Sequence, residues 1–347
     1  MNQPSVPELF RLQARYCRIL ESPLYEHLLE EAAADYERGG LTARILSPHE
    51  RDEPKTMLSL RFMGAMHRAV LEGKAPELAE FYPSVGGRVD LGRVWPVFSE
   101  TLERLGEDLH EEIALPVQTN EVARCAALLG GFLLVAEETG LPLRVLEIGA
   151  SAGLNLNFDR YGYASDGRSW GDQSSPVHLR DIIEGDTFPW STDAEVAERR
   201  GCDASPLDPT SDRTRLLLRS FIWPDQTERF ALLTAALDFA RTNAVEVEQA
   251  DAAAWAARQL EHPAEGRATV MFHSLVMMYL SDESREGMIA VIEAAGQNAS
   301  DSAPVARLCM ELGGDEADVR LTLWPGGEER LIAKAGYQGQ HVHWLGL

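Results

Sequence analysis

The segment Val145–Asn155 places the strongest constraint on what this 347-residue chain can fold into. It reads VLEIGASAGLN, a short apolar run followed by a loop of glycines and small residues. A strand that ends at Gly149 must turn sharply, and glycine permits the backbone angles of such a turn. Small residues as far as Gly153 let a ligand approach the main chain. A helix is expected to follow, and its N-terminus presents free N–H groups to a polar or anionic ligand.

The residue patterns on either side of this segment differ in kind. Before about residue 115 apolar residues recur at helical spacing, and no convincing alternating strand precedes residue 140. Beyond residue 140, strand patterns alternate with helical patterns, which predicts an α/β fold with a mostly parallel sheet. We therefore predict a helical N-terminal domain and an α/β domain, at 1–115 and 116–347, with an insertion rich in Gly, Ser, Asp and Pro at about 160–195.

Start and stop signals place several elements of the second domain. Thr119 or Asn120 can cap a helix that ends at Gly140. A buried strand is predicted over 268–275, followed by a helix from Ser281 to Gly296. Near the end of the chain, Pro325-Gly326-Gly327 predicts a hairpin between the last two long strands.

The charge balance and the cysteines exclude several classes of protein. Lys and Arg number 32 against 55 Asp and Glu, a formal net charge of −23. Such a chain repels polyanions, which argues against a general nucleic-acid binder. The longest apolar run, 125–136, is too short to span a bilayer. The four scattered cysteines form no CxxC pair, so we expect reduced thiols in a cytoplasmic protein.

Polar residues follow three further predicted strands. Asp203 lies in GCDASP, Asp251 follows the strand pattern at 245–248, and His273 lies in VMFHS. In open α/β sheets the carboxyl ends of the strands meet at the ligand-binding edge. Each residue also has a purely structural interpretation. Asp203 can be a turn or cap residue, Asp251 can cap the following helix, and His273 can be a hydrogen-bonded histidine lining the cleft.

The spacing E-x-G-x-S-x-G from Glu147 to Gly153 resembles the first motif of class I S-adenosylmethionine-dependent methyltransferases. That motif is usually E/D-x-G-x-G-x-G, so Ser151 replaces its middle glycine. The resemblance implies a Rossmann-like sheet of about seven strands, mostly parallel, with an antiparallel C-terminal hairpin. It implies S-adenosylmethionine as cofactor, with its methionine end at the loop, its ribose at Asp203 and its adenine at Asp251. The implied cofactor-binding residues are Glu147 (near the amino group), Gly149, Ala150, Ser151, Gly153, Asn155, Asp203, Ala204, Asp251 and Ala252.

Five segments taken together resemble a bacterial family of uncharacterised proteins, a domain of unknown function. They are PVQTNEVARCAAL, LEIGASAGLNLNFDRYGY, GCDASPLDP, RSFIWPDQTERF and VMFHSLVMMYL. The resemblance is strongest from 116 to 280 and supplies no substrate. The residues that it suggests near the cleft are Gln118, Asn120, Asn155, Trp223 and Arg229. The chain departs from the methyltransferase pattern at GGDEAD, which is too short for the helix expected before the terminal hairpin.

These observations predict methyl transfer from S-adenosylmethionine to a small molecule, with the N-terminal helices covering the acceptor. Transfer depends mainly on alignment of the reactants, and His273 is the candidate general base because its usual pKa is near working pH. We expect no metal site, because His341 and His343 lack a third ligand.

Two other functions fit the same loop. Gly149–Gly153 also satisfies G-x-S-x-G, the nucleophile elbow of α/β-hydrolases. Ser151 would then attack, with an acid and a base chosen from Asp251 or Asp315 and His341 or His343. Against this, residues 1–140 offer helices where a hydrolase has strands. The third function is a non-catalytic S-adenosylmethionine-binding regulator.

Overall fold

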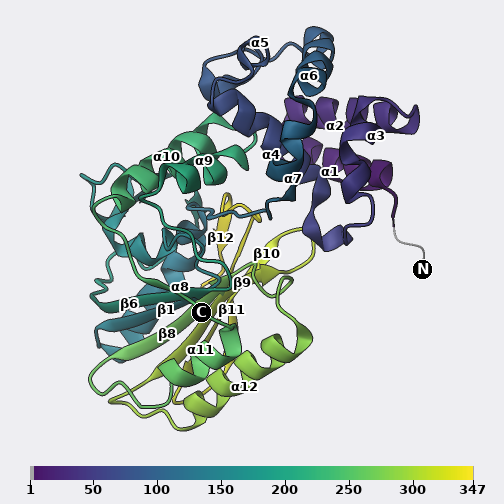
Figure 1. Cartoon of the computed structure of the whole chain (residues 1–347). Coiled ribbons are helices and arrows are strands. Elements are labelled where there is room, and N and C mark those ends of the chain that lie inside the picture. Colours follow the sequence, from purple (N-terminus) through teal and green to yellow (C-terminus); the bar gives the residue numbers. More distant parts are fainter. Residues whose placement is uncertain (1–3, 347) are drawn as a thin grey trace. The chain divides into compact units, whose positions relative to one another are not determined.

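The computed structural model describes residues 4–346, apart from the side chain of Glu107, and it divides into two compact units. Unit 1 contains residues 4–119 and Asp212–Ala231. Unit 2 contains Asn120–Ser211 and residues 232–346. Figure 1 labels the α-helices of both units and most, but not all, of the strands.

Unit 1 is built from helices around an aromatic core. Phe62 packs against Phe10 and Phe98, and all three side chains are fully buried. Its α-helices are α1 (Val6–Ile19), α2 (Pro23–Glu37), α3 (Leu41–Leu46), α4 (Leu58–Leu71), α5 (Pro76–Ala79), α6 (Leu91–Leu105), α7 (Leu109–Ala114), α9 (Asp212–Ser220) and the first turn of α10 (Thr227–Ala240). Short 3₁₀ helices are η1 (Ser47–His49), η2 (Pro54–Thr56), η3 (Pro83–Val85) and η4 (Gly106–Asp108).

Unit 2 is organised by a nine-stranded sheet in the order β5-β12-β11-β10-β9-β8-β1-β6-β7. Its strands are β1 (Leu143–Ile148), β5 (Ile183–Glu184), β6 (Val196–Asp203), β7 (Val247–Gln249), β8 (Ala268–Ser274), β9 (Val305–Leu312), β10 (Ala317–Trp324), β11 (Glu329–Ala335) and β12 (Val342–Trp344). The five strands from β7 to β9 run parallel, whereas β9 to β12 form an antiparallel meander. The predicted α/β fold with a mostly parallel sheet is confirmed, with nine strands where about seven were expected.

Helices cover both faces of this sheet. On one face lies α8 (Arg124–Thr139), where Gly131 leaves room for the side chain of Leu308. On the other lie α11 (Ala252–Gln259) and α12 (Asp282–Gln297), where Gly296 packs directly against Trp324. The central strands are therefore buried from both sides, and every residue of β8 except its last is buried. This accounts for the continuous apolar runs that predicted parallel strands.

Between β1 and β6 the chain forms elements of its own. The 3₁₀ helix η5 (Asn155–Arg160) follows the glycine loop. A separate three-stranded sheet, in the order β3-β2-β4, consists of β2 (Gly162–Ser165), β3 (Arg168–Gly171) and β4 (His178–Arg180). The stretch then adds β5 to the far edge of the large sheet, where it pairs with β12.

Most of the predicted boundaries in unit 2 are confirmed, but the start of α8 was predicted wrongly. Ser281 caps α12, and Gly140 ends α8 with φ +65°. The helix α8, however, begins at Arg124 and not at Thr119 or Asn120. Asn120 is an attractive capping residue, but its side-chain oxygen instead accepts hydrogen bonds from the glycine loop. The contact of Asn120 with a distant loop thus takes the place of the helix cap that the local sequence predicted.

Candidate functional site

The carboxyl ends of β7, β6, β1 and β8 lie side by side and bring the predicted residues to one edge of unit 2. β1 pairs with β6 on one side and with β8 on the other, so that Ile148 lies opposite both Cys202 and His273. β6 pairs in turn with β7, and the carbonyl of Asp203 accepts from the amide of Ala250. The glycine loop therefore lies between the segment of Asp203 and the end of β8.

The glycine loop makes a tight turn with three residues at positive φ. Gly149 and Gly153 both have φ +71°, and Ser151 has φ +51°. A Cβ atom on Gly149 would lie 2.4 Å from the side chain of Val276, so this position requires glycine for space as well as conformation. Ser151 occupies the left-handed region without being glycine, which costs on the order of 1–2 kcal/mol. It is the position where the methyltransferase motif usually has glycine.

Every backbone N–H from Gly149 to Leu154 is satisfied within the protein. Two amides, those of Gly149 and Ala150, donate to the carbonyl of Cys202, and that of Gly153 donates to Ala150. The amide of Ser151 donates to the carboxylate of Asp203 at 2.9 Å. Those of Ala152 and Leu154 donate to Oδ1 of Asn120 at 3.2 and 3.1 Å. The expectation that this loop offers its amides to an anionic ligand is therefore wrong, and the element that follows is a 3₁₀ helix.

Glu147 is a buried carboxyl group just before the loop. Its residue is 2% exposed, and Oε2 is buried without a hydrogen-bond partner in the described part of the chain. Burial raises the pKa of Glu147 well above its usual value, and the charge of Asp203 raises it further. Arg124 and Asn155 act in the opposite direction and lower the pKa of Glu147. An unsatisfied buried oxygen is costly, so its presence in a fold calls for an explanation.

Asp203 and Asp251 are both used structurally by the fold. The Asp203 carboxylate accepts from the amides of Ser151 and, at 2.8 Å, of Ser205. Asp251 caps α11 by accepting from the amide of Ala254, and its second oxygen accepts from Ser284 Oγ at 2.7 Å. The capping interpretation of Asp251 is thus confirmed.

His273 is fully buried at the end of β8 and is paired with a carboxylate that the sequence analysis did not single out. Nδ1 lies 2.7 Å from Oε1 of Glu311, whereas Nε2 is buried and has no partner among the described residues. Glu311 is the penultimate residue of β9, whose sequence is VARLCMEL. An acidic residue near the end of this largely apolar strand was the signal that could have identified it. The role of His273 as general base stays a prediction, since neither ring nitrogen is exposed to solvent in this structure.

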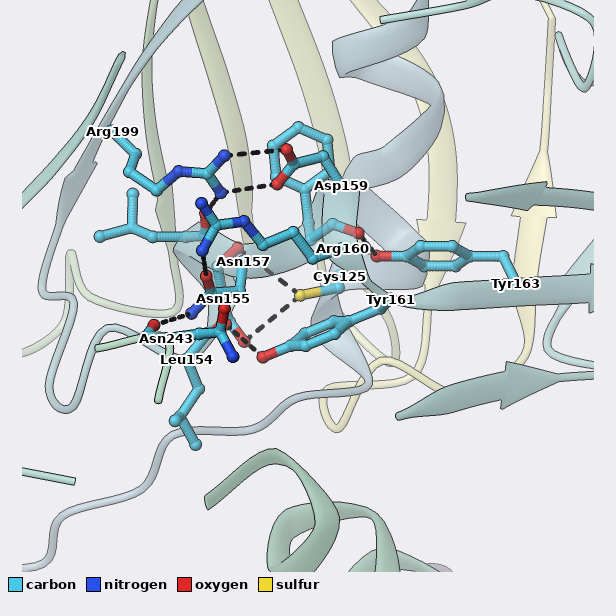
Figure 2. A network of polar contacts seen from close by, with 12 residues as sticks. Cys125, Leu154, Asn155, Asn157, Asp159, Arg160, Tyr161, Tyr163, Arg199 and Asn243 are labelled. Carbon is cyan, nitrogen blue, oxygen red and sulfur yellow. Dashed lines mark hydrogen bonds and ion pairs between the residues drawn. The ribbon is translucent and has the colours of Figure 1, made fainter. Parts of the chain in front are cut away.

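A polar network behind the loop fixes the segment that follows it (Figure 2). Arg199 on β6 makes a bidentate ion pair with Asp159, with N···O distances of 2.7 and 2.9 Å, and donates to the carbonyl of Leu156. The hydroxyl of Tyr161 donates to the carbonyl of Leu154 at 2.6 Å. Asn155, which is 3% exposed, accepts from the thiol of Cys125. Asn155 therefore lies beneath the loop as part of its support.

The remaining predicted residues are distributed over both units. Ala150 and Ala252 are buried at the edge formed by the strand ends, and Ala204 is exposed beside Asp203, with its carbonyl accepting from Gln249. Three of the residues that the family resemblance suggested belong to unit 1: Gln118, Trp223 and Arg229. His343 on β12 lies close to Glu184 on β5, with 3.1 Å between its Nδ1 and the Oε2 of Glu184. Within residues 4–346 no cluster of three or more His, Cys, Asp or Glu side chains could hold a metal ion.

The fold and this edge define an α/β protein with a glycine loop at the carboxyl end of its first strand. The helices of the described chain include none that is both long and apolar enough to cross a membrane. A family model described as an uncharacterised protein conserved in bacteria, DUF2332, matches residues 7–344. The chain therefore belongs to this family. Comparison with curated proteins and with solved structures gave no match.

Proposed function

We propose that unit 2 binds S-adenosylmethionine at the carboxyl edge of its sheet and transfers the methyl group to a small-molecule acceptor. The observation that carries this proposal is the polarity of the edge. Three carboxyl groups lie at the ends of neighbouring strands, Glu147 one residue before the end of β1, Asp203 at the end of β6 and Asp251 just after β7, while the loop amides are occupied. The edge therefore offers acceptors and negative charge, which favours a ligand with an amine, a sulfonium and vicinal hydroxyls over a phosphate ligand.

The strand order supports the same proposal. Numbered along the chain, the parallel strands β1, β6, β7, β8 and β9 lie in the order 3-2-1-4-5. This is the order of doubly wound dinucleotide-binding sheets, whose ligands bind where the order reverses, beside strand 1. The glycine loop and Asp203 both lie there. The missing helix between β9 and β10 is a departure from the methyltransferase pattern, and the short connection that replaces it leaves the carboxyl end of β9, beside β8.

Different residues of the chain would bind different parts of the ligand. The small residues Gly149, Ser151 and Gly153 would let the methionine end lie close to the main chain, with Glu147 toward its amino group. Asp203 would accept from the ribose hydroxyls and Asp251 from the adenine amino group. When bound, S-adenosylmethionine supplies an electrophilic methyl group on a sulfonium. Since the transfer needs chiefly alignment, the rigid support of the loop by Asn120 and Asp203 is the main contribution of this protein.

One observation favours the hydrolase alternative, namely the strained φ of +51° at Ser151, which a nucleophile elbow also requires. The proposed bases argue against it. His343 lies on β12, five strands from β1, and at about 4.8 Å per strand this separates them by roughly 24 Å. His341 directly precedes β12. The methyltransferase proposal needs no such partner, and we therefore prefer it.

Titration with S-adenosylhomocysteine in a calorimeter tests the proposal. We expect the wild-type chain to bind, Asp203→Ala to weaken binding at least tenfold, and Asp203→Asn, which keeps an acceptor for Ser151, to weaken it less. The matched control is Asp208→Ala, because Asp208 makes the same kind of local turn with Thr210 nearby in the chain. The proposal is wrong if the wild-type chain does not bind, or if a fluorophosphonate labels Ser151.

A further inference from the structure

The segment that follows β8, residues 275–280, lies directly on the glycine loop. Leu275 has φ +50°, which turns the chain sharply out of the strand. The side chain of Val276 then fills the space beside Gly149, where no Cβ would fit. The segment is followed by Ser281, whose hydroxyl caps α12 by accepting from the amide of Ser284. The position of residues 275–280 therefore determines one wall of the candidate site.

One carboxylate oxygen holds this segment from the neighbouring strand. Oε1 of Glu311 accepts from the amides of Val276 and Met277 at 3.1 and 3.4 Å. The same oxygen lies 2.7 Å from Nδ1 of His273. The Glu311 side chain is 18% exposed, so these contacts are partly shielded from water. Hydrogen bonds to a charged acceptor are stronger than those between neutral groups.

The contact with His273 also orients the imidazole. A carboxylate oxygen only accepts hydrogen bonds, so Nδ1 must carry the hydrogen of this contact and donate it to Glu311. The ring is fully buried, so it serves as a rigid side support for Glu311. Glu311 thus connects three elements: β8 through His273, the segment 275–280 through two amides, and the glycine loop through Val276.

We propose that Glu311 is a positioning residue of the candidate site, which acts by holding residues 275–280 against the glycine loop. The proposal rests on the function proposed above in so far as it makes Glu311 necessary for cofactor affinity. The segment itself is held whether or not a ligand is bound. These two consequences are measured separately.

Amide hydrogen exchange of the whole chain without ligand tests the holding. In Glu311→Ala and in Glu311→Met, which preserves most of the side-chain volume, Val276 and Met277 should exchange at least tenfold faster than in the wild type. Glu311→Gln should stay within about threefold, because its amide oxygen still accepts. His273→Ala should accelerate exchange of both amides less than Glu311→Ala does, since the Glu311 carboxylate remains but loses its side support. The matched control is Glu329→Ala, which removes a carboxylate paired with Arg320 on the same sheet.

Affinity for S-adenosylhomocysteine should follow the same order, with about a tenfold loss in Glu311→Met, partial rescue in Glu311→Gln and no change in Glu329→Ala. Unchanged exchange in both Glu311→Ala and Glu311→Met would overturn the positioning role, as would equal acceleration in the control. If the exchange results hold but the wild-type chain does not bind, the holding role stands and the proposed function fails.

Discussion

At the scale of single residues, the candidate site contains two of the unfavourable features that the described chain also shows elsewhere, a buried polar atom without a partner and a non-glycine residue at positive φ. Glu147 places a carboxyl oxygen in a dry environment without a partner, and Ser151 adopts a backbone conformation that favours glycine. Strain and unsatisfied polar groups of this kind accumulate at functional sites. Both residues lie in the same seven-residue motif, which supports a ligand at this position.

Glu147→Gln is expected to make the free protein more stable while weakening cofactor binding. Burial raises the pKa of Glu147 above its usual value of 4.5. The native state then binds more protons than the unfolded state, so stability falls as the pH rises from about 4.5 through the raised pKa. Glutamine does not ionise, so Glu147→Gln does not lose stability in this way as the pH rises. Each unit of pKa difference corresponds to about 1.4 kcal/mol, so a gain on the order of 1 kcal/mol or more is expected at pH 8 and little at pH 4.

Urea denaturation midpoints at the two pH values measure this effect. Glu138→Gln provides the control, because Glu138 is partly exposed and only pairs with Arg330 on the surface. Equal stability of the wild type and Glu147→Gln at both pH values would show that the buried carboxyl group is not a destabilising element of the free protein.

At the scale of elements, the loop depends on supports that come from distant parts of the sequence. Asn120 precedes α8, Asp203 ends β6, and Arg199 on the same strand holds the segment after the loop through Asp159. The strand, the glycine loop and the hairpin were predictable because their signals are local. The family resemblance suggested Asn120 near the cleft, but its bonds to the loop amides and the contacts of Glu311 were not predictable, because each joins residues more than 30 positions apart.

Arg199→Met is expected to lower the stability of unit 2 and to loosen the segment that follows the loop. It removes a bidentate ion pair whose side chains are 14% and 16% exposed, and it leaves the Asp159 carboxylate without its cation. We expect a loss of about 2 kcal/mol. Arg199→Lys should recover only part, because an ammonium group cannot replace the planar fork.

The neighbouring Arg200 offers a matched control, since it lies on the same strand, is about half exposed and pairs with Glu198. Arg200→Met should change the free energy of unfolding, measured by urea denaturation, by less than about 0.5 kcal/mol. A similar loss in both variants would mean that the strand, and not the ion pair of Arg199, determines the effect.

At the scale of the whole molecule, composition and pattern predicted the class of fold, and strand order refined it. Alternating strand and helix patterns sufficed for a parallel sheet because βαβ connections leave a strong periodic signal. The meander β9–β12 and the edge strand β5 extend the sheet beyond seven strands, and β5 and β12 are too short to leave such a signal. The excess of acidic residues gave no information about the fold, but it agrees with the proposal that the edge binds a cationic ligand.

The central claim is that the edge formed by β7, β6, β1 and β8 accepts a cationic adenosyl ligand and not an anionic one. Calorimetric titration of the wild-type chain with S-adenosylmethionine, ATP and NAD⁺ tests it most directly. We predict that S-adenosylmethionine binds with a dissociation constant on the order of micromolar, the usual range for enzyme substrates, and that ATP and NAD⁺ bind at least about 100-fold more weakly because the loop has no free amides for phosphate. Binding of ATP or NAD⁺ as tight as that of S-adenosylmethionine would contradict the account.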